Sequence, residues 1–209
     1  IMSYKDTLFF IGKCLTINHE KHNKLLVEEK LKTNTVDWDA IVKISTGHFV
    51  FPALYCNLKK ADFLHYLPED LVEYMQHITD LNRERNEQII IQAKELNELL
   101  LANNITPIFL KGTGNLLEGL YEDIAERMVG DIDFLVAKED CKKAYTLLTD
   151  KGYDKVTDIY EEHRHLNRLV HSSKIAAVEI HRAMIKEKKS DSFDYQTIKD
   201  SIFCESGIS

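Results

Sequence analysis

The sequence predicts an α+β protein, in which an N-terminal helical region packs on a small mixed β-sheet. Through much of residues 1–105, apolar side chains recur at steps of three and four, the spacing of one helix face. Residues 106–183 change to short apolar runs broken by glycine and polar residues, which is typical of short strands and helices. We therefore expect a helical region over 1–105 and an α/β core over 106–209. With 44% hydrophobic residues, the 209-residue chain is ample for one or two packed domains.

The helical region carries start and stop signals of its own. Asp37 is a residue type that caps helices, so a helix is predicted from Trp38 onward. Pro68 suits the first turn of another helix. From Leu71 an apolar stripe continues toward 103–104, two asparagines where the helix is expected to stop. Core packing explains this stripe without any functional role.

The core begins with a strand, a glycine-rich turn and a helix. Residues 108–110 (Ile-Phe-Leu) read as a buried strand, and 112–114 (Gly-Thr-Gly) are expected to break it before a helix starts at Asn115. A turn that leads into a helix leaves backbone N–H groups free to meet phosphate oxygens. Lys111 adds a positive charge beside them, although a solvated strand end would explain this lysine equally well.

Two carboxylates interrupt the next apolar run, residues 130–136. Side chains at i and i+2 of a strand point to the same face, so Asp131 and Asp133 are expected to project together. Ile132, Phe134 and Val136 then fill the opposite, buried face. Neighbouring carboxylates repel each other unless a cation lies between them, and Mg²⁺ held by carboxylates and substrate phosphates is the natural choice. The pattern therefore favours metal-dependent phosphate chemistry.

A third carboxylate, Glu179, lies within another apolar run over 175–181. We predict a strand here, with residues 165–171 as its antiparallel partner before a turn at 172–174. If this strand lies beside the Asp131–Asp133 strand, three acids converge and could hold a pair of metal ions. The alternative is a structural role for Glu179, capping the hairpin or pairing with Arg168.

These motifs together resemble the uncharacterised bacterial nucleotidyltransferase-like family of the nucleotidyltransferase superfamily. The resemblance rests on Leu-Lys-Gly at 110–112, Arg127, Asp-Ile-Asp-Phe-Leu-Val at 131–136 and Val-Glu-Ile-His at 178–181, and it covers roughly residues 35–185. It departs from the commonest pattern in having Thr113 where many members have serine, and in a longer spacing from Gly112 to Asp131.

The resemblance implies transfer of a nucleoside monophosphate from ATP or another NTP to a small-molecule or protein acceptor, with release of pyrophosphate. It implies Mg²⁺ or Mn²⁺ as the cofactor. The implied catalytic and metal-binding residues are Asp131, Asp133 and Glu179. The implied nucleotide-binding residues are Lys111, Gly112, Thr113, Gly114 and Arg127. Because families with this core often continue with helices that cover the acceptor, we expect the chain to be truncated at its C-terminus.

Charge, cysteine content and hydropathy indicate which partners and which compartment the protein is expected to have. A net charge of −7 does not favour nucleic acid, which normally binds to a basic stripe. Four scattered cysteines form no Cys-x-x-Cys pair and no disulfide framework, which is consistent with a reducing, cytoplasmic compartment. No apolar run approaches the roughly 20 residues that a membrane span requires.

Three other interpretations remain open. The acids could bind nucleotide without turnover, in a regulator or a toxin–antitoxin-type partner. Asp-x-Asp also holds sugar nucleotides through Mn²⁺ in glycosyltransferases, although a helical region precedes the motif here instead of a nucleotide-binding α/β region. Histidines cluster late in the chain and could hold zinc, or His181 could approach the nucleotide or substrate. The clustered histidines are His163, His165, His171 and His181.

Overall fold

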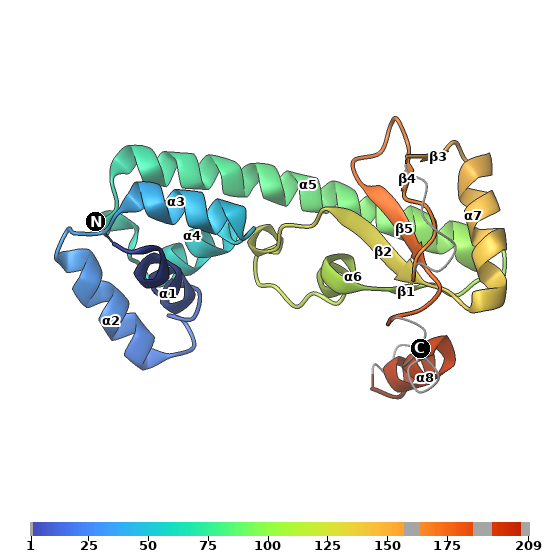
Figure 1. The fold of residues 1–209 in the computed structure, drawn as a ribbon, viewed down its shortest axis with the longest axis horizontal. Helices are drawn as coiled ribbons and strands as arrows, with labels where there is room; N and C mark the ends of the chain where they lie inside the picture. The colour runs from blue at the N-terminus through green and yellow to red at the C-terminus, as the bar shows by residue number, and fades with distance from the viewer. Residues whose placement is uncertain (1, 157–163, 186–193, 206–209) are drawn as a thin grey trace. The chain divides into compact units, whose positions relative to one another are not determined.

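The computed structural model describes residues 2–156, 164–185 and 194–205 (Figure 1). It contains helices and one small mixed sheet, so the predicted α+β class is confirmed. The chain divides into two compact units, residues 1–86 with 121–128 and residues 87–120 with 129–209. Helix α5 (Glu69–Leu101) contributes its first part to one unit and its last part to the other. Among the described residues, no helix is both long and apolar enough to cross a bilayer.

The first unit is helical. Besides α5 it contains α1 (Tyr4–Cys14), α2 (Lys21–Lys32), α3 (Trp38–Gly47), α4 (Phe51–Lys60) and the 3₁₀ turn η1 (Leu64–Tyr66). The Asp37 side chain accepts a hydrogen bond from the Ala40 N–H, which confirms the predicted cap of α3. Buried apolar residues from these helices form one core, and Met75 of the predicted α5 stripe is part of it.

Residues 121–128 fold onto α5 within this first unit, around the 3₁₀ turn η2 (Ile124–Glu126). Asn82 and Asn86 of α5 both donate to the carbonyl oxygen of Arg127, at 3.1 and 2.7 Å. Arg83 binds the Asp123 carboxylate through Nε at 3.0 Å and Nη2 at 2.7 Å. These contacts fix the backbone of Arg127 and leave its side chain exposed.

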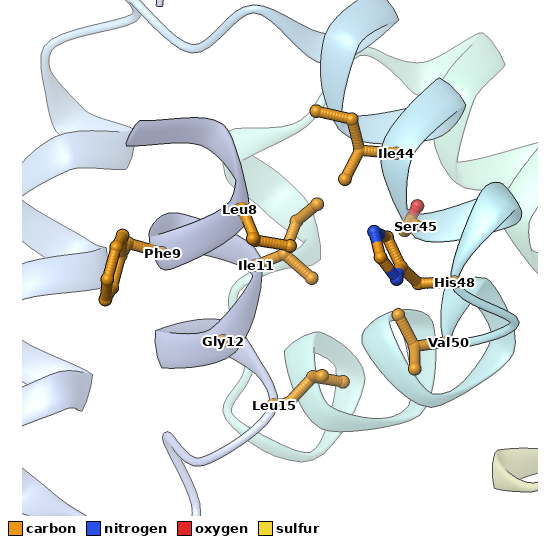
Figure 2. A pocket seen from close by; sticks show the side chains of 9 residues that line it. All are labelled: Leu8, Phe9, Ile11, Gly12, Leu15, Ile44, Ser45, His48 and Val50. Carbon is orange, nitrogen blue, oxygen red and sulfur yellow. The ribbon is translucent and has the colours of Figure 1, made fainter. Parts of the chain in front are cut away.

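An apolar pocket of about 430 Å³ lies between α1, α3 and the start of α4 (Figure 2). Leu8, Ile44 and Val50 are among the side chains that line it, and its polar groups come from Ser45 and His48. Ser45 already donates to the Ile41 carbonyl oxygen at 2.6 Å. The pocket therefore offers neither the carboxylates nor the array of donors that a metal-bound triphosphate needs.

The second unit holds the sheet, whose strand order is β1-β2-β5-β4-β3. The strands are β1 (Ile108–Phe109), β2 (Asp131–Leu135), β3 (Asp154–Lys155), β4 (Leu169–Val170) and β5 (Ala177–His181). Strands β2 and β5 are parallel, and every other pair is antiparallel. The antiparallel partner predicted before the turn at 172–174 is β4.

In the described part of the second unit, three helices accompany α5. They are α6 (Lys111–Leu117), α7 (Cys141–Asp150, preceded by the 3₁₀ turn η3 at Lys138–Asp140) and α8 (Tyr195–Glu205). Tyr195 of α8 donates its hydroxyl hydrogen to the Thr106 carbonyl oxygen at 2.7 Å. Tyr195 and Ile198 pack against the buried cluster of Ile108, Leu110 and Leu135, so α8 covers part of the β1–β2 region.

Gln92 of α5 ties the helix to the start of β5. Its side-chain amide donates to the Ala176 carbonyl oxygen at 2.9 Å and accepts from the Ala176 N–H at 3.1 Å. It also bonds the Tyr153 hydroxyl at 3.2 Å. Both Gln92 and Ala176 are buried, so these bonds satisfy polar groups that water cannot reach.

The predicted glycine turn after β1 was wrong in detail. Helix α6 begins at Lys111, so Gly112, Thr113 and Gly114 lie inside its first turns and not before it. The unusual backbone conformation lies at Lys111 itself, whose φ of 52° falls in the left-handed region. Gly114 is required by close packing, because a Cβ there would lie 2.7 Å from the Phe109 carbonyl oxygen.

Candidate active site

Two parallel strands present acidic side chains on one face of the sheet. The Cα atom of Asp133 on β2 lies opposite that of Glu179 on β5. Asp131 and His181 lie two residues along their strands from these acids, on the same face by the period of two. The neighbours Ile132 and Phe134 are fully buried on the opposite face, as predicted. Strand period and strand pairing thus bring the side chains of Asp133, Glu179 and His181 together.

Asp133 lies at the centre of this arrangement. Only 6% of its surface is exposed, and its Oδ1 atom lies 2.6 Å from Lys111 Nζ and 2.8 Å from His181 Nε2. Burial alone would raise the pKa of the Asp133 carboxyl, but the hydrogen bonds from His181 and Lys111 outweigh it and hold that pKa below its ordinary value. Asp133 is therefore a carboxylate at neutral pH.

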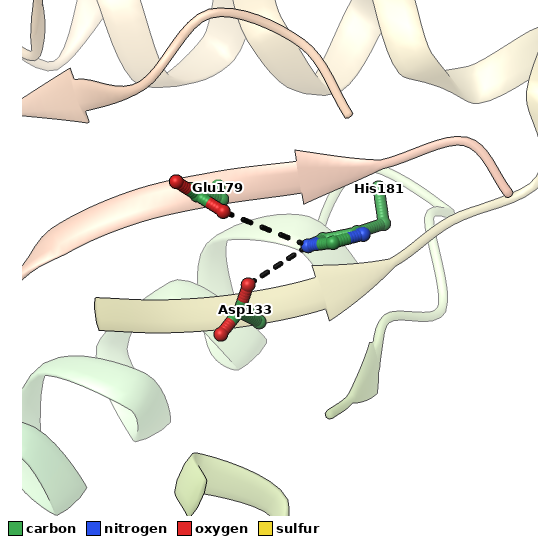
Figure 3. Close-up of side chains that lie close together, drawn as sticks. All are labelled: Asp133, Glu179 and His181. Carbon is green, nitrogen blue, oxygen red and sulfur yellow. Dashed lines mark hydrogen bonds and ion pairs between the residues drawn. The ribbon is translucent and has the colours of Figure 1, made fainter. Parts of the chain in front are cut away.

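Glu179 completes a group that could hold a cation (Figure 3). One ligand atom from each of Asp133, Glu179 and His181 lies within 4.8 Å of the other two. Glu179 Oε2 lies 3.9 Å from His181 Nε2 and 3.8 Å from His165 Nε2, distances too long for hydrogen bonds. A divalent ion accepts oxygen and nitrogen ligands at about 2.0–2.2 Å, so small movements would bring these atoms into one coordination shell.

Asp131 stands outside that group. Its carboxylate pairs with the guanidinium of Arg168, a residue just before β4. The sequence had suggested Glu179 as the partner of Arg168, but the hydrogen bond goes to Asp131. Each aspartate of the Asp-x-Asp pair thus has its own cation, Lys111 for Asp133 and Arg168 for Asp131. These cations balance the repulsion between the two carboxylates.

The remaining candidate nucleotide-binding residues are placed as follows. Lys111 reaches Asp133, and its side chain is about half exposed. Gly112 and Thr113 are buried, and the Thr113 hydroxyl donates to the Asp131 carbonyl oxygen at 3.2 Å. Thr113 and Gly114 thus hold α6 against β2 and β1. Arg127 belongs to the first unit, where its backbone is fixed by the two asparagines of α5.

The histidines divide between the site and its surroundings. His181 is buried and contacts Asp133, and His165 pairs with His181 across an isolated β-bridge, with ring centroids 5.3 Å apart. His171 instead bonds Ser173 and packs on Tyr153. His163 lies outside the described residues. The sequence signal for this pair was weak, since His165 and His181 are separated by a turn and only their pairing across the hairpin aligns them.

A comparison with protein families places most of the chain in a known family. A family model described as "Uncharacterised nucleotidyltransferase" covers residues 34–202, a range that contains Lys111, the Asp-x-Asp pair and Glu179. The match confirms the resemblance seen in the sequence motifs. Neither the comparison with curated proteins nor that with solved structures gave a match.

Proposed function

The chain belongs to the uncharacterised nucleotidyltransferase family, and on this premise we propose that it moves an NMP group from an NTP to a small-molecule or protein acceptor. The observation that supports this most strongly is the pairing of Asp133 with Glu179 on neighbouring parallel strands. It puts two carboxylates from distant parts of the sequence on one face, beside a lysine. This combination suits a nucleotide triphosphate bound with a divalent ion, since the carboxylates can hold the ion and the lysine can meet the phosphates.

In the proposed reaction an acceptor oxygen attacks the α-phosphorus of the NTP. The bond from that phosphorus to the bridging oxygen of the β-phosphate breaks, and pyrophosphate leaves with its electron pair. The proton of the acceptor hydroxyl passes to a base, for which Glu179 is our candidate. Glu179 suits this role because its carboxylate is partly buried and makes no hydrogen bond shorter than 3.5 Å to either nearby imidazole.

A divalent metal ion fits the donor set. Asp131, Asp133 and Glu179 are the carboxylates that we propose to hold Mg²⁺ or Mn²⁺, and Asp133 and Glu179 already meet in a group able to hold an ion. When bound, the ion would neutralise the negative charge of the triphosphate. Lys111 pairs with Asp133 and Arg168 with Asp131. When an ion binds, each of these side chains must move away from its carboxylate.

Lys111 is the residue best suited to meet the phosphates. Its side chain is about half exposed, so Nζ can turn from Asp133 toward an incoming triphosphate without a large desolvation cost. We keep the backbone of Gly112, Thr113 and Gly114 as further candidate nucleotide contacts. Arg127, which belongs to the first unit, stays a candidate from the sequence alone.

The second candidate is nucleotide binding without turnover. The observation that favours it is the neutralisation of both aspartates by Lys111 and Arg168, which would suit a site that no longer binds metal tightly. A regulator of this kind would bind NTP but release no pyrophosphate.

The test is incubation with each α-³²P-labelled NTP, Mg²⁺ or Mn²⁺ and a host lysate, followed by detection of transferred label and of pyrophosphate. We expect Glu179→Gln to lower the transfer rate by roughly 10²–10⁴-fold while nucleotide affinity changes little, because a base acts mainly in the transition state. Glu98→Gln is the matched control, since Glu98 is an exposed carboxylate of the same unit. Nucleotide binding without transfer in the parent chain would favour the regulator, and equal rates in both variants would remove Glu179 from the chemistry.

A further inference from the structure

His165 directs one ring nitrogen toward Glu179 and the other toward the backbone. Its Nδ1 lies 2.9 Å from the Leu166 carbonyl oxygen, which can only accept, so Nδ1 carries the proton of the neutral ring. The lone pair of Nε2 then faces Glu179 Oε2 at 3.8 Å. A histidine that binds metal typically donates its other N–H to a carbonyl or carboxylate in this way.

His181 approaches the same carboxylate oxygen from the neighbouring position. Its Nε2 lies 3.9 Å from Glu179 Oε2 and 2.8 Å from Asp133 Oδ1. Two imidazole nitrogens thus lie nearly equidistant from one oxygen of Glu179, with Asp133 beside them. All four side chains are largely buried, with 2–17% of each exposed. Asp133, Glu179 and His181 offer ligand atoms within 4.8 Å of one another, and His165 Nε2 lies beside this group, 3.8 Å from Glu179 Oε2. Buried electron-rich atoms this close together favour a cation among them.

We propose that Asp133, His165, Glu179 and His181 form a site for a first-row transition metal ion such as Mn²⁺, Co²⁺ or Zn²⁺, in preference to Mg²⁺. The inference deepens the proposed function by naming the class of its metal, and it rests on that function only for the catalytic use of the ion. Imidazole nitrogen is a good ligand for transition ions, whereas Mg²⁺ selects oxygen and water. Two histidines and a glutamate are also a ligand set that holds catalytic zinc.

Neither His181 nor Lys111 opposes this assignment. His181 Nδ1 is buried without a hydrogen-bond partner among the described residues. Coordination through Nε2 would move the ring proton to Nδ1, which is unsatisfied in either tautomer, so no new unsatisfied atom arises. Lys111 Nζ bonds Asp133 Oδ1, but 48% of its side chain is exposed and it can turn to solvent when an ion arrives.

The test is titration of the metal-free full chain with Co²⁺, followed by its visible absorption and by calorimetry. Loss of a partner that only orients a ligand costs about 10–100-fold in metal affinity, so loss of a ligand should cost at least as much. We therefore expect His165→Gln and His181→Gln each to weaken Co²⁺ binding at least tenfold and to weaken its visible bands. His171→Gln is the matched control and should leave both unchanged, since His171 pairs with Ser173. Circular dichroism of each variant checks that the fold is retained. His165 is more exposed than His181 (12% against 2%), so His165→Gln keeps the test decisive if His181→Gln unfolds.

Competition completes the test. We expect Zn²⁺ to displace Co²⁺ at equal concentration and Mg²⁺ to fail to do so even in hundredfold excess. Displacement by an equal concentration of Mg²⁺, or a folded His165→Gln that binds Co²⁺ as the parent does, would overturn the inference. NTP transfer with Mg²⁺ at full rate in His165→Gln would sink the inference and leave the proposed function intact. If Co²⁺ binding depends on the histidines but no metal supports NTP transfer, the inference stands and the proposed function fails.

Discussion

Replacing Gln92 by alanine tests whether one side chain of α5 fixes the start of the strand that carries Glu179 and His181. The substitution removes the bonds to both polar backbone groups of Ala176, which is only 3% exposed. An orphaned buried donor or acceptor costs about 1–3 kcal/mol, so the two together should cost about 2–6 kcal/mol. Alanine keeps the helix propensity of α5 high, so the loss reports the contact with Ala176 and not the helix.

Amide hydrogen exchange is the assay of choice, because a chain with two units need not unfold in one step. A loss of about 2 kcal/mol corresponds to roughly 30-fold faster exchange of the β5 amides. Gln88→Ala is the matched control, since Gln88 is exposed one turn earlier on α5 and in the same unit. It should change stability by less than about 0.5 kcal/mol. A cost below about 1 kcal/mol for Gln92→Ala would refute the reasoning, because it would mean that Ala176 is satisfied without this side chain.

Three further predictions follow from single contacts. Lys111→Ala should weaken triphosphate binding more than monophosphate binding in calorimetry, and equal losses would assign Lys111 a structural role. Gly114→Ala should cost about 1–3 kcal/mol in urea unfolding because its Cβ meets the Phe109 carbonyl oxygen, whereas Gly130→Ala, with open space around it, should cost much less. Because the pKa of folded Asp133 is lowered, its ionised form stabilises the fold above its unfolded pKa, and this stability is lost as pH falls. The parent should therefore lose stability relative to Asp133→Asn below about pH 4, and parallel pH profiles would contradict the assignment.

Local sequence patterns determined much of the fold. The period-two alternation of 131–136 predicts that Ile132 and Phe134 are buried, and they are. Asp133 and Leu135 on the other face are buried too, which the alternation does not predict. Asp37 predicts the start of α3 because a capping side chain bonds a backbone N–H only a few residues further along the chain. Asp131, Asp133 and Glu179 could be chosen as candidates for the same reason, since a carboxylate within an apolar strand stands out locally.

Where local signals competed, the sequence was less informative. Glycines at 112 and 114 indicated a turn before the helix, yet the helix begins at Lys111, which is also the residue with a left-handed φ. A glycine is needed at 114 because of a close contact and not because of a turn, since the Phe109 carbonyl leaves no room for a side chain. The secondary-structure propensity of one element cannot predict its contact with another element.

The pairing of the site residues was decided by the tertiary structure alone. Period two predicts the face of each strand, but only the parallel register of β2 and β5 puts Asp133 opposite Glu179. The same register, with the bridge between His165 and His181, brings imidazoles to the acids. Arg168 binds Asp131, which lies 37 positions away in the sequence. The sequence alone had suggested Glu179 as the partner of Arg168. The sequence determined which side chains each element presents, because helix and strand periods are local; the fold determined which of them meet, because strand order and register depend on packing between distant segments.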